Sequence, residues 1–111
     1  MTGITSTLIV KALDGLSARA AATAENIANA NSPGFRPLRV TFEDALAAAA
    51  RGGEASVRAV EPRTAGAPAG ERVRVDLELA TASATALRYS ALTELLGRQL
   101  QIETLAITGE R

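Results

Sequence analysis

The sequence predicts a mainly α-helical protein with two long terminal helices that pack as a coiled-coil-like pair. A short helix and an irregular centre with weak β content are expected to join them. Small and apolar residues recur at alternating spacings of three and four near both ends, as in helices that pack lengthwise. Between these segments, glycines and prolines interrupt short alternating patterns. The 111 residues are expected to form a single domain, 1–111.

The first helix is expected over residues 4–31. Gly15 lies inside it and costs about 1 kcal/mol relative to alanine in a helix. At a rise of ~1.5 Å per residue the helix would be about 40 Å long, so the molecule should be elongated. The apolar stripe of this helix consists of Ile9, Leu13, Leu16, Ala20, Thr23, Ile27 and Ala30.

Residues 32–75 are expected to form a turn, a short helix and a loop. Pro33-Gly34 suits the central pair of a type II turn, in which glycine supplies the positive φ. Pro37 should keep the residues after it extended.

The short helix is expected to begin with Thr41 as its N-cap, because acidic residues follow in its first turn. It should continue to the glycine pair at 52–53. Beyond this pair, strand-like pieces are expected around 56–60 and 72–75 within a flexible loop.

The last helix is expected over residues 76–109, with Asp76 as N-cap and Gly109 as the stop signal. Its apolar residues cover a broad surface, and a face this wide can touch more than one neighbour. A stripe with spacings of three and four contains Leu79, Ala82, Ala86, Tyr89, Leu96, Leu100 and Ile107, and Leu92, Leu95, Ile102 and Leu105 widen it.

The composition argues against most catalytic functions. The chain contains no histidine and no cysteine, so it has no imidazole base, no thiolate nucleophile and no imidazole or thiolate ligand for zinc. Twelve basic and twelve acidic residues balance, and no basic block suggests nucleic-acid binding. We therefore expect no enzyme activity, no cofactor, no metal and no nucleic-acid partner. No stretch approaches the ~20 apolar residues of a membrane span, and no cleaved signal peptide is evident.

Three closely spaced asparagines are the most informative feature of the chain. Asn26, Asn29 and Asn31 precede Ser32-Pro33-Gly34-Phe35, whereas an ordinary helix end needs only one glycine or asparagine past its last turn. One interpretation is that they cap a helix end. The other is that buried asparagines fix the register of packed helices at some cost in stability.

A second candidate site lies on the last helix, at Arg88-Tyr89. Arginine and tyrosine are enriched in interaction hot spots. A packed tyrosine beside an arginine whose stem covers apolar surface is an equally good interpretation.

Residues 24–36, which read Ala-Glu-Asn-Ile-Ala-Asn-Ala-Asn-Ser-Pro-Gly-Phe-Arg, closely resemble the N-terminal signature of the flagellar rod, hook and hook-filament family of bacterial axial proteins. Family members commonly read Asn-Ile-Ala-Asn-Ala-x-Thr-Pro-Gly-Tyr-Lys, so Ser32, Phe35 and Arg36 are mild departures. Residues 86–93, which contain Arg88-Tyr89, are most similar to the B-type proximal rod proteins of this family.

The resemblance implies a structural subunit of the proximal rod of the flagellar basal body. Such subunits leave the cytoplasm through the flagellar type III export system and polymerise into a torque-transmitting helical tube in the periplasm. The implied partners are copies of itself, other rod subunits, the MS-ring with its rod adaptor protein, and the export gate. The implied assembly and registry residues are Asn26, Ile27, Asn29, Asn31, Pro33, Gly34, Phe35, Arg88, Tyr89, Leu92, Leu96 and Leu100.

Phe42 and Leu46 form a possible export motif, because an aromatic residue followed four residues later by an aliphatic one resembles the gate-recognition pattern of rod and hook substrates. The alternative is ordinary packing between positions i and i+4 of a short helix. Two other functions stay open: a C-type rod subunit of the same family, and a soluble helical-hairpin adaptor or chaperone.

Overall fold

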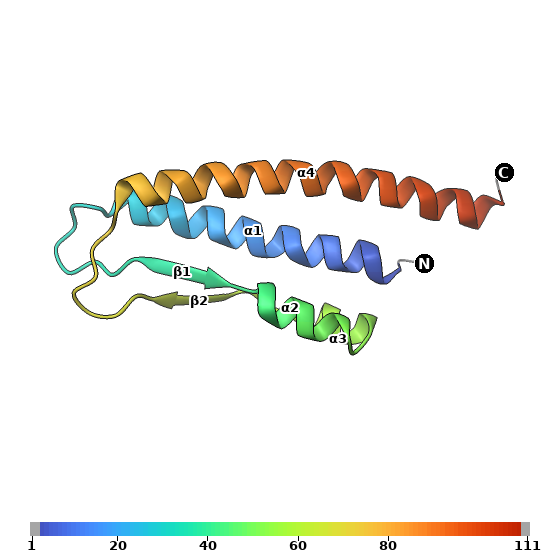
Figure 1. Cartoon of the computed structure of the whole chain (residues 1–111), viewed down its shortest axis with the longest axis horizontal. Coiled ribbons are helices and arrows are strands. Elements are labelled where there is room, and N and C mark those ends of the chain that lie inside the picture. Colours follow the sequence, from blue (N-terminus) through green and yellow to red (C-terminus); the bar gives the residue numbers. More distant parts are fainter. Residues whose placement is uncertain (1–2, 110–111) are drawn as a thin grey trace.

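The computed structural model describes residues 3–109, which form one flat layer of elements lying side by side (Figure 1). Helix α1 occupies the middle of this layer. Helix α4 runs along one side of it, and a β hairpin with two short helices runs along the other. The extents of the layer are 60 × 26 × 14 Å. The prediction of a mainly helical protein with two long terminal helices and little β structure is confirmed.

Helix α1 spans Ile4–Ala28 and ends earlier than the expected residue 31. Asn29 is its C-cap, and the amide of that side chain donates to the carbonyl of Glu25 at 2.9 Å. The chain then continues through turns, with Ser32 N donating to Asn29 O at 3.0 Å. The predicted stripe of this helix faces inward at Ile9, Leu16 and Thr23, which are all buried.

The irregular centre contains a two-stranded antiparallel sheet. Strand β1 (Leu38–Thr41) pairs with β2 (Arg63–Gly66), so that Leu38 lies opposite Gly66. The predicted extension after Pro37 is β1. The strands predicted around 56–60 and 72–75 are wrong.

The first of these segments forms helix α3 (Glu54–Arg58) instead of a strand. Gly53 precedes it with a φ of +99°, which reverses the chain, and Glu54 pairs with Arg58 across one helical turn. Val57 is completely buried, which anchors this short helix. The second segment leads directly into α4.

Helix α2 spans Glu43–Ala50 and has Phe42, not Thr41, at its N-cap. Thr41 is unavailable as a cap because it belongs to β1, where it lies opposite Arg63. No side chain caps α2, but Glu43 in its first turn suits the helix dipole.

Helix α4 spans Val75–Thr108, so it begins one residue before Asp76, and Arg74 takes the N-cap position. Gly109 ends it in the left-handed conformation, as predicted. Helix α4 runs antiparallel to α1, because Glu78 bonds to Asn26 near one end and Glu103 bonds to Gly3 near the other. Within residues 3–109, neither long helix nor any other is apolar enough over a sufficient length to cross a bilayer.

The side chains of α4 that lie against α1 match the predicted apolar face only in part, at Ala82, Leu92 and Leu96. Its least exposed residues recur at heptad spacing and are largely small or polar; this α1-facing seam is Glu78, Ala82, Thr85, Leu92, Leu96, Gln99 and Glu103. Most of the predicted stripe points elsewhere: Leu79 is 54% exposed and Ile107 is 70% exposed. Hydrogen bonds from Asn26 and Ser6 of α1 explain why the two ends of the seam carry the carboxylates of Glu78 and Glu103.

Candidate functional site

Asn26 forms a buried polar network that joins α1, β1 and α4. Only 1% of its surface is exposed. Its Nδ2 donates to Leu38 O at 3.0 Å and to Glu78 Oε1 at 2.9 Å, and its Oδ1 accepts from Leu38 N at 2.7 Å. The whole carboxamide is therefore satisfied, and one side chain sets the position of the first strand residue relative to both long helices.

Arg39 completes this network from the strand. Its Nη1 lies 3.3 Å from Glu78 Oε2, and its Nη2 lies 2.9 Å from Glu71 Oε2. The carboxylate of Glu78 is nearly buried and receives bonds from both Asn26 and Arg39, so its charge is not left uncompensated.

A second packing site fixes the hairpin side of the molecule to the middle of α1. The ring of Phe42 lies directly against Gly15, where a Cβ would come within 2.4 Å of the ring. Phe42 is 5% exposed, and Arg19 Cζ lies 4.9 Å from its ring centre. Gly15 therefore admits an aromatic ring to the helix surface, which accounts for a glycine in the helix interior.

Arg19 links this packing site to the start of α2. Its guanidinium donates to both carboxylate oxygens of Glu43, at 2.6 and 2.8 Å, and to Val40 O at 2.7 Å. The hydrogen bond from Arg19 lowers the pKa of Glu43 to about 2. Because the guanidinium donates two parallel hydrogen bonds to the carboxylate, this pair fixes the orientation of the start of α2 relative to α1 as well as the distance between them.

The other two asparagines occupy a different environment from Asn26. Asn29 caps α1 through Glu25 O, and its Oδ1 accepts from Ser32 Oγ at 3.1 Å. Asn31 is exposed in the loop that follows. The geometry of Asn29 is thus that of a helix cap, and Asn26 is the asparagine that joins separate elements.

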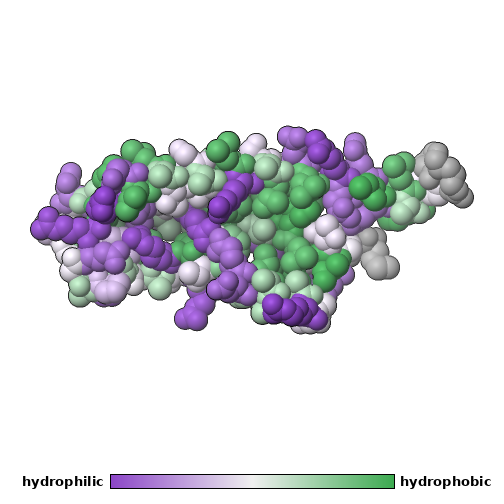
Figure 2. Space-filling model, viewed as in Figure 1, coloured by the Kyte–Doolittle hydropathy of each residue, from purple (hydrophilic) through white to green (hydrophobic). Residues whose placement is uncertain are grey.

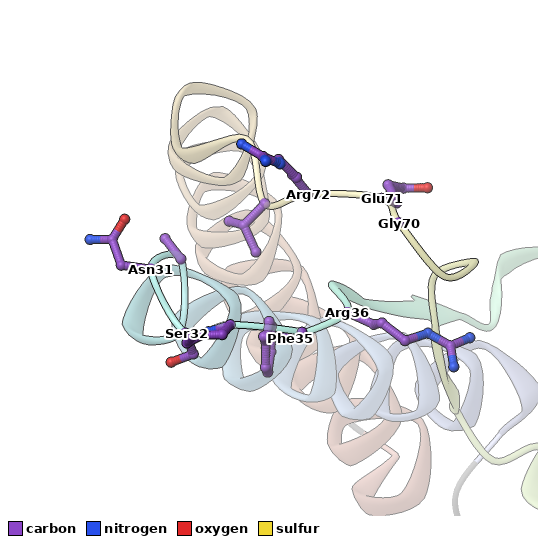
Figure 3. Close-up of a pocket in the computed structure, with 11 residues that line it drawn as sticks. Asn31, Ser32, Phe35, Arg36, Gly70, Glu71 and Arg72 are labelled. Atoms are coloured by element: carbon purple, nitrogen blue, oxygen red, sulfur yellow. The ribbon is translucent and has the colours of Figure 1, made fainter.

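Residues 32–35 form the predicted turn. Phe35 N donates to Ser32 O at 3.2 Å, and Gly34 has a φ of +75°. This turn borders a pocket of about 530 Å³ at one end of the molecule, opposite the segment from Gly70 to Val73 (Figure 3). In this view Arg36 extends away from the pocket and toward the hairpin, where its Nε donates to Ala67 O at 2.6 Å.

The remaining predicted site residues lie in two groups. Ile27, Phe35, Leu46, Leu92 and Leu96 are half-buried, and Leu46 and Leu92 pack against the small core around Phe42. Arg88, Tyr89 and Leu100 are exposed on α4. The structure thus separates Leu92 and Leu96, on the α1-facing seam, from Arg88, Tyr89 and Leu100 outside it.

Helix α4 carries most of the exposed large apolar residues of the described chain. Figure 2 shows apolar side chains gathered in a broad area right of the centre of the view, over α4, α1 and the short helices α2 and α3. We call the exposed large apolar residues of α4, which are distributed along its whole length, the exposed apolar set: Val75, Leu77, Leu79, Leu87, Tyr89, Leu95, Leu100, Ile102, Leu105 and Ile107. A shallow groove of about 710 Å³ beside them has Ala20, Ala86 and Tyr89 among its lining residues.

Sequence reasoning missed the partners that make these sites. Glu78 is a carboxylate at a heptad position of a helix, which is a recognisable signal for a buried polar partner. Gly15 among good helix formers is a signal for close approach by another group. Arg39 and Arg19 carry no local signal, because their partners lie 39 and 24 residues away.

Comparison with models of known protein families finds no match, and comparison with curated protein sequences finds none either. Among residues 3–109, no three acidic side chains gather in a way that could hold a metal ion.

Proposed function

We propose that this chain is a structural subunit of the proximal rod of the bacterial flagellar basal body, of the B type. The proposal rests on the resemblance of residues 24–36 and 86–93 to that family and on one structural observation. Helix α4 is already paired with α1, yet its exposed apolar set still faces solvent.

The arrangement in a single layer strengthens this argument. Protein domains usually bury their apolar faces between two packed layers, and here the second layer is missing from the isolated chain. Contiguous exposed apolar surface marks interaction sites. In the proposed rod, α1 and α4 form a coiled-coil-like pair, and neighbouring subunits cover the exposed apolar set.

The Asn26 network suits a subunit that transmits torque. It satisfies both backbone groups of Leu38 and bonds to Glu78, so the hairpin and the two long helices should turn as one body. In this proposal Asn26 fixes register within the subunit, and Arg88 and Tyr89 lie at contacts between subunits.

The proposal includes export through the flagellar type III system, with the export gate, the MS-ring and its rod adaptor protein as partners. Phe42 is buried and Leu46 is half-buried in the folded chain. If these two residues act as an export motif, the gate must therefore meet them before the chain folds.

The test replaces one exposed apolar residue and asks whether basal bodies assemble. Leu87 is 73% exposed, so Leu87→Glu should leave the fold and helix content intact but prevent incorporation into isolated basal bodies. Ala48→Glu adds the same charge at an exposed position of α2 and serves as the matched control. If the native chain stays in the soluble fraction as a single copy bound to one partner protein, the rod proposal fails. A helical-hairpin adaptor or chaperone is then the better assignment.

A further inference from the structure

One end of α4 extends past its partner helix. Glu103 accepts hydrogen bonds from Gly3 N and Ser6 Oγ, at the first residues of α1, so residues 104–109 project beyond that helix (Figure 1). This projecting end carries Leu105 and Ile107, which are 51% and 70% exposed. Its last turn contains no basic residue, so among residues 3–109 no nearby side chain of this helix end balances the partial negative charge of the helix C-terminus.

The opposite end of the molecule carries the 530 Å³ pocket, which we call the loop pocket. Pro33, Phe35 and Val73 supply apolar surface to it. Among its charged residues, Glu71 is paired with Arg39 at 2.9 Å, whereas Arg72 forms no ion pair within the described residues 3–109. The loop pocket is thus partly apolar and carries a cation that no carboxylate neutralises.

We infer that the projecting end of α4 docks in the loop pocket of a second copy of this chain. The charges are complementary, because the carbonyl end of a helix would meet Arg72. The apolar surfaces also correspond, since Leu105 and Ile107 would lie against Pro33, Phe35 and Val73. The size agrees as well: one helical turn with its side chains, ~11 Å wide and 5.4 Å high, fills roughly 500 Å³.

This inference rests on the proposed function and specifies one of its contacts. The contact joins unlike ends of the molecule, so it is heterologous and does not close on itself. Copies would then follow one another along the long axis, at a repeat slightly below the 60 Å length of the chain.

Cysteine cross-linking tests the contact directly, because the chain contains no native cysteine. Ser32→Cys labels the loop pocket and Ile107→Cys labels the projecting end. Mixing the two single variants under mild oxidation should give covalent dimers that contain one of each, and the double variant should give a ladder of multimers. Leu87→Cys, which is highly exposed in the middle of α4, is the control and should not cross-link to Ser32→Cys.

A charge exchange provides the second arm of the test. Arg72→Glu should lower the yield of the Ser32–Ile107 cross-link by about tenfold, because a carboxylate would face the carbonyl end of the helix. Adding Thr108→Arg to the projecting end should restore the yield. Circular dichroism of each variant would verify that its helix content is unchanged.

Three outcomes would overturn the inference. Cross-linking of Ser32→Cys to Leu87→Cys, or of Ile107→Cys only to itself, would leave self-assembly intact but place the contact elsewhere. Binding of inorganic phosphate that depends on Arg72, with no Ser32–Ile107 product, would assign the loop pocket to a small anion. A chain that sediments as a monomer and gives no cross-link in any pair would contradict both this contact and the proposed function.

Discussion

Replacing the two helical glycines by alanine should change stability in opposite directions. Gly15 lies in α1 and Gly97 in α4. A Cβ at Gly15 would meet the Phe42 ring at 2.4 Å, whereas a Cβ at Gly97 would have nothing within 4 Å. The two substitutions are chemically identical, so any difference between them reports the surroundings and not the helix propensity.

The magnitudes follow from two effects. Each substitution gains about 1 kcal/mol from the higher helix propensity of alanine. At Gly15 the ring of Phe42 must move, and overpacking of this kind costs about 1–3 kcal/mol. Loss of the whole ring contact would cost at most about 3–5 kcal/mol. We therefore expect Gly97→Ala to stabilise by up to about 1 kcal/mol and Gly15→Ala to destabilise by up to about 2 kcal/mol.

Urea unfolding followed by circular dichroism measures both changes, and thermal unfolding should show them as shifts of several degrees in opposite directions. Phe42→Ala provides the control background. Without the ring, Gly15→Ala should become stabilising, and the double-mutant cycle should give a coupling of about 2 kcal/mol between the two positions. Equal stabilisation by both alanines in the native background would refute the contact between Gly15 and Phe42.

Three further predictions concern the polar sites and the turn. Asn26→Leu should lower the free energy of unfolding by about 3 kcal/mol, because three partner atoms lose their hydrogen bonds. Asn29→Ala removes only a helix cap and should lower it by under about 1 kcal/mol. Urea unfolding measures both changes. Since Arg19 lowers the pKa of Glu43 from 4.5 to about 2, the pair stabilises the fold above pH 4.5 and loses this effect as the pH falls toward 2. Glu43→Gln should reduce the change in the free energy of unfolding between pH 4.5 and 2 by under about 1 kcal/mol. An unchanged dependence of the unfolding free energy on pH would contradict the pairing of Arg19 with Glu43. Gly34→Val should cost about 1–3 kcal/mol in thermal unfolding because φ is +75°, whereas Gly34→Asn should be nearly neutral.

The long elements could be predicted because their signals are local. The heptad spacing in α1 and α4 and the glycine at 109 are properties of neighbouring residues, and the helices follow them within a few positions. The positive φ at Gly34 was predictable for the same reason. The strands were misplaced because all four residues of β2 are exposed and its sequence, Arg-Thr-Ala-Gly, has no apolar alternation. Its position depends on its partner β1, which lies more than twenty residues earlier.

The buried face of α4 was misjudged for a related reason. Apolar periodicity identifies the face that avoids water, but it does not say which neighbour covers that face. In this chain α1 packs against a seam of α4 that includes Glu78, Thr85 and Glu103. Asn26 and Ser6 of α1 form hydrogen bonds with the two carboxylates of this seam. The sequence offered a register role to Asn26, Asn29 and Asn31 alike and did not single out Asn26, because its partners Leu38 and Glu78 depend on the tertiary arrangement.

The antiparallel pairing of α1 with α4 also determines the order of events during synthesis. Residues that bond between these helices are 52 and 97 positions apart in the chain. At 5–20 residues per second, on the order of 10 s separate the completion of α1 from the completion of α4. Throughout that interval the nascent chain has no α4 against which α1 can pack. A factor that must act on the unfolded N-terminal half, whether a chaperone or an export receptor, therefore has seconds in which to bind before the pair closes.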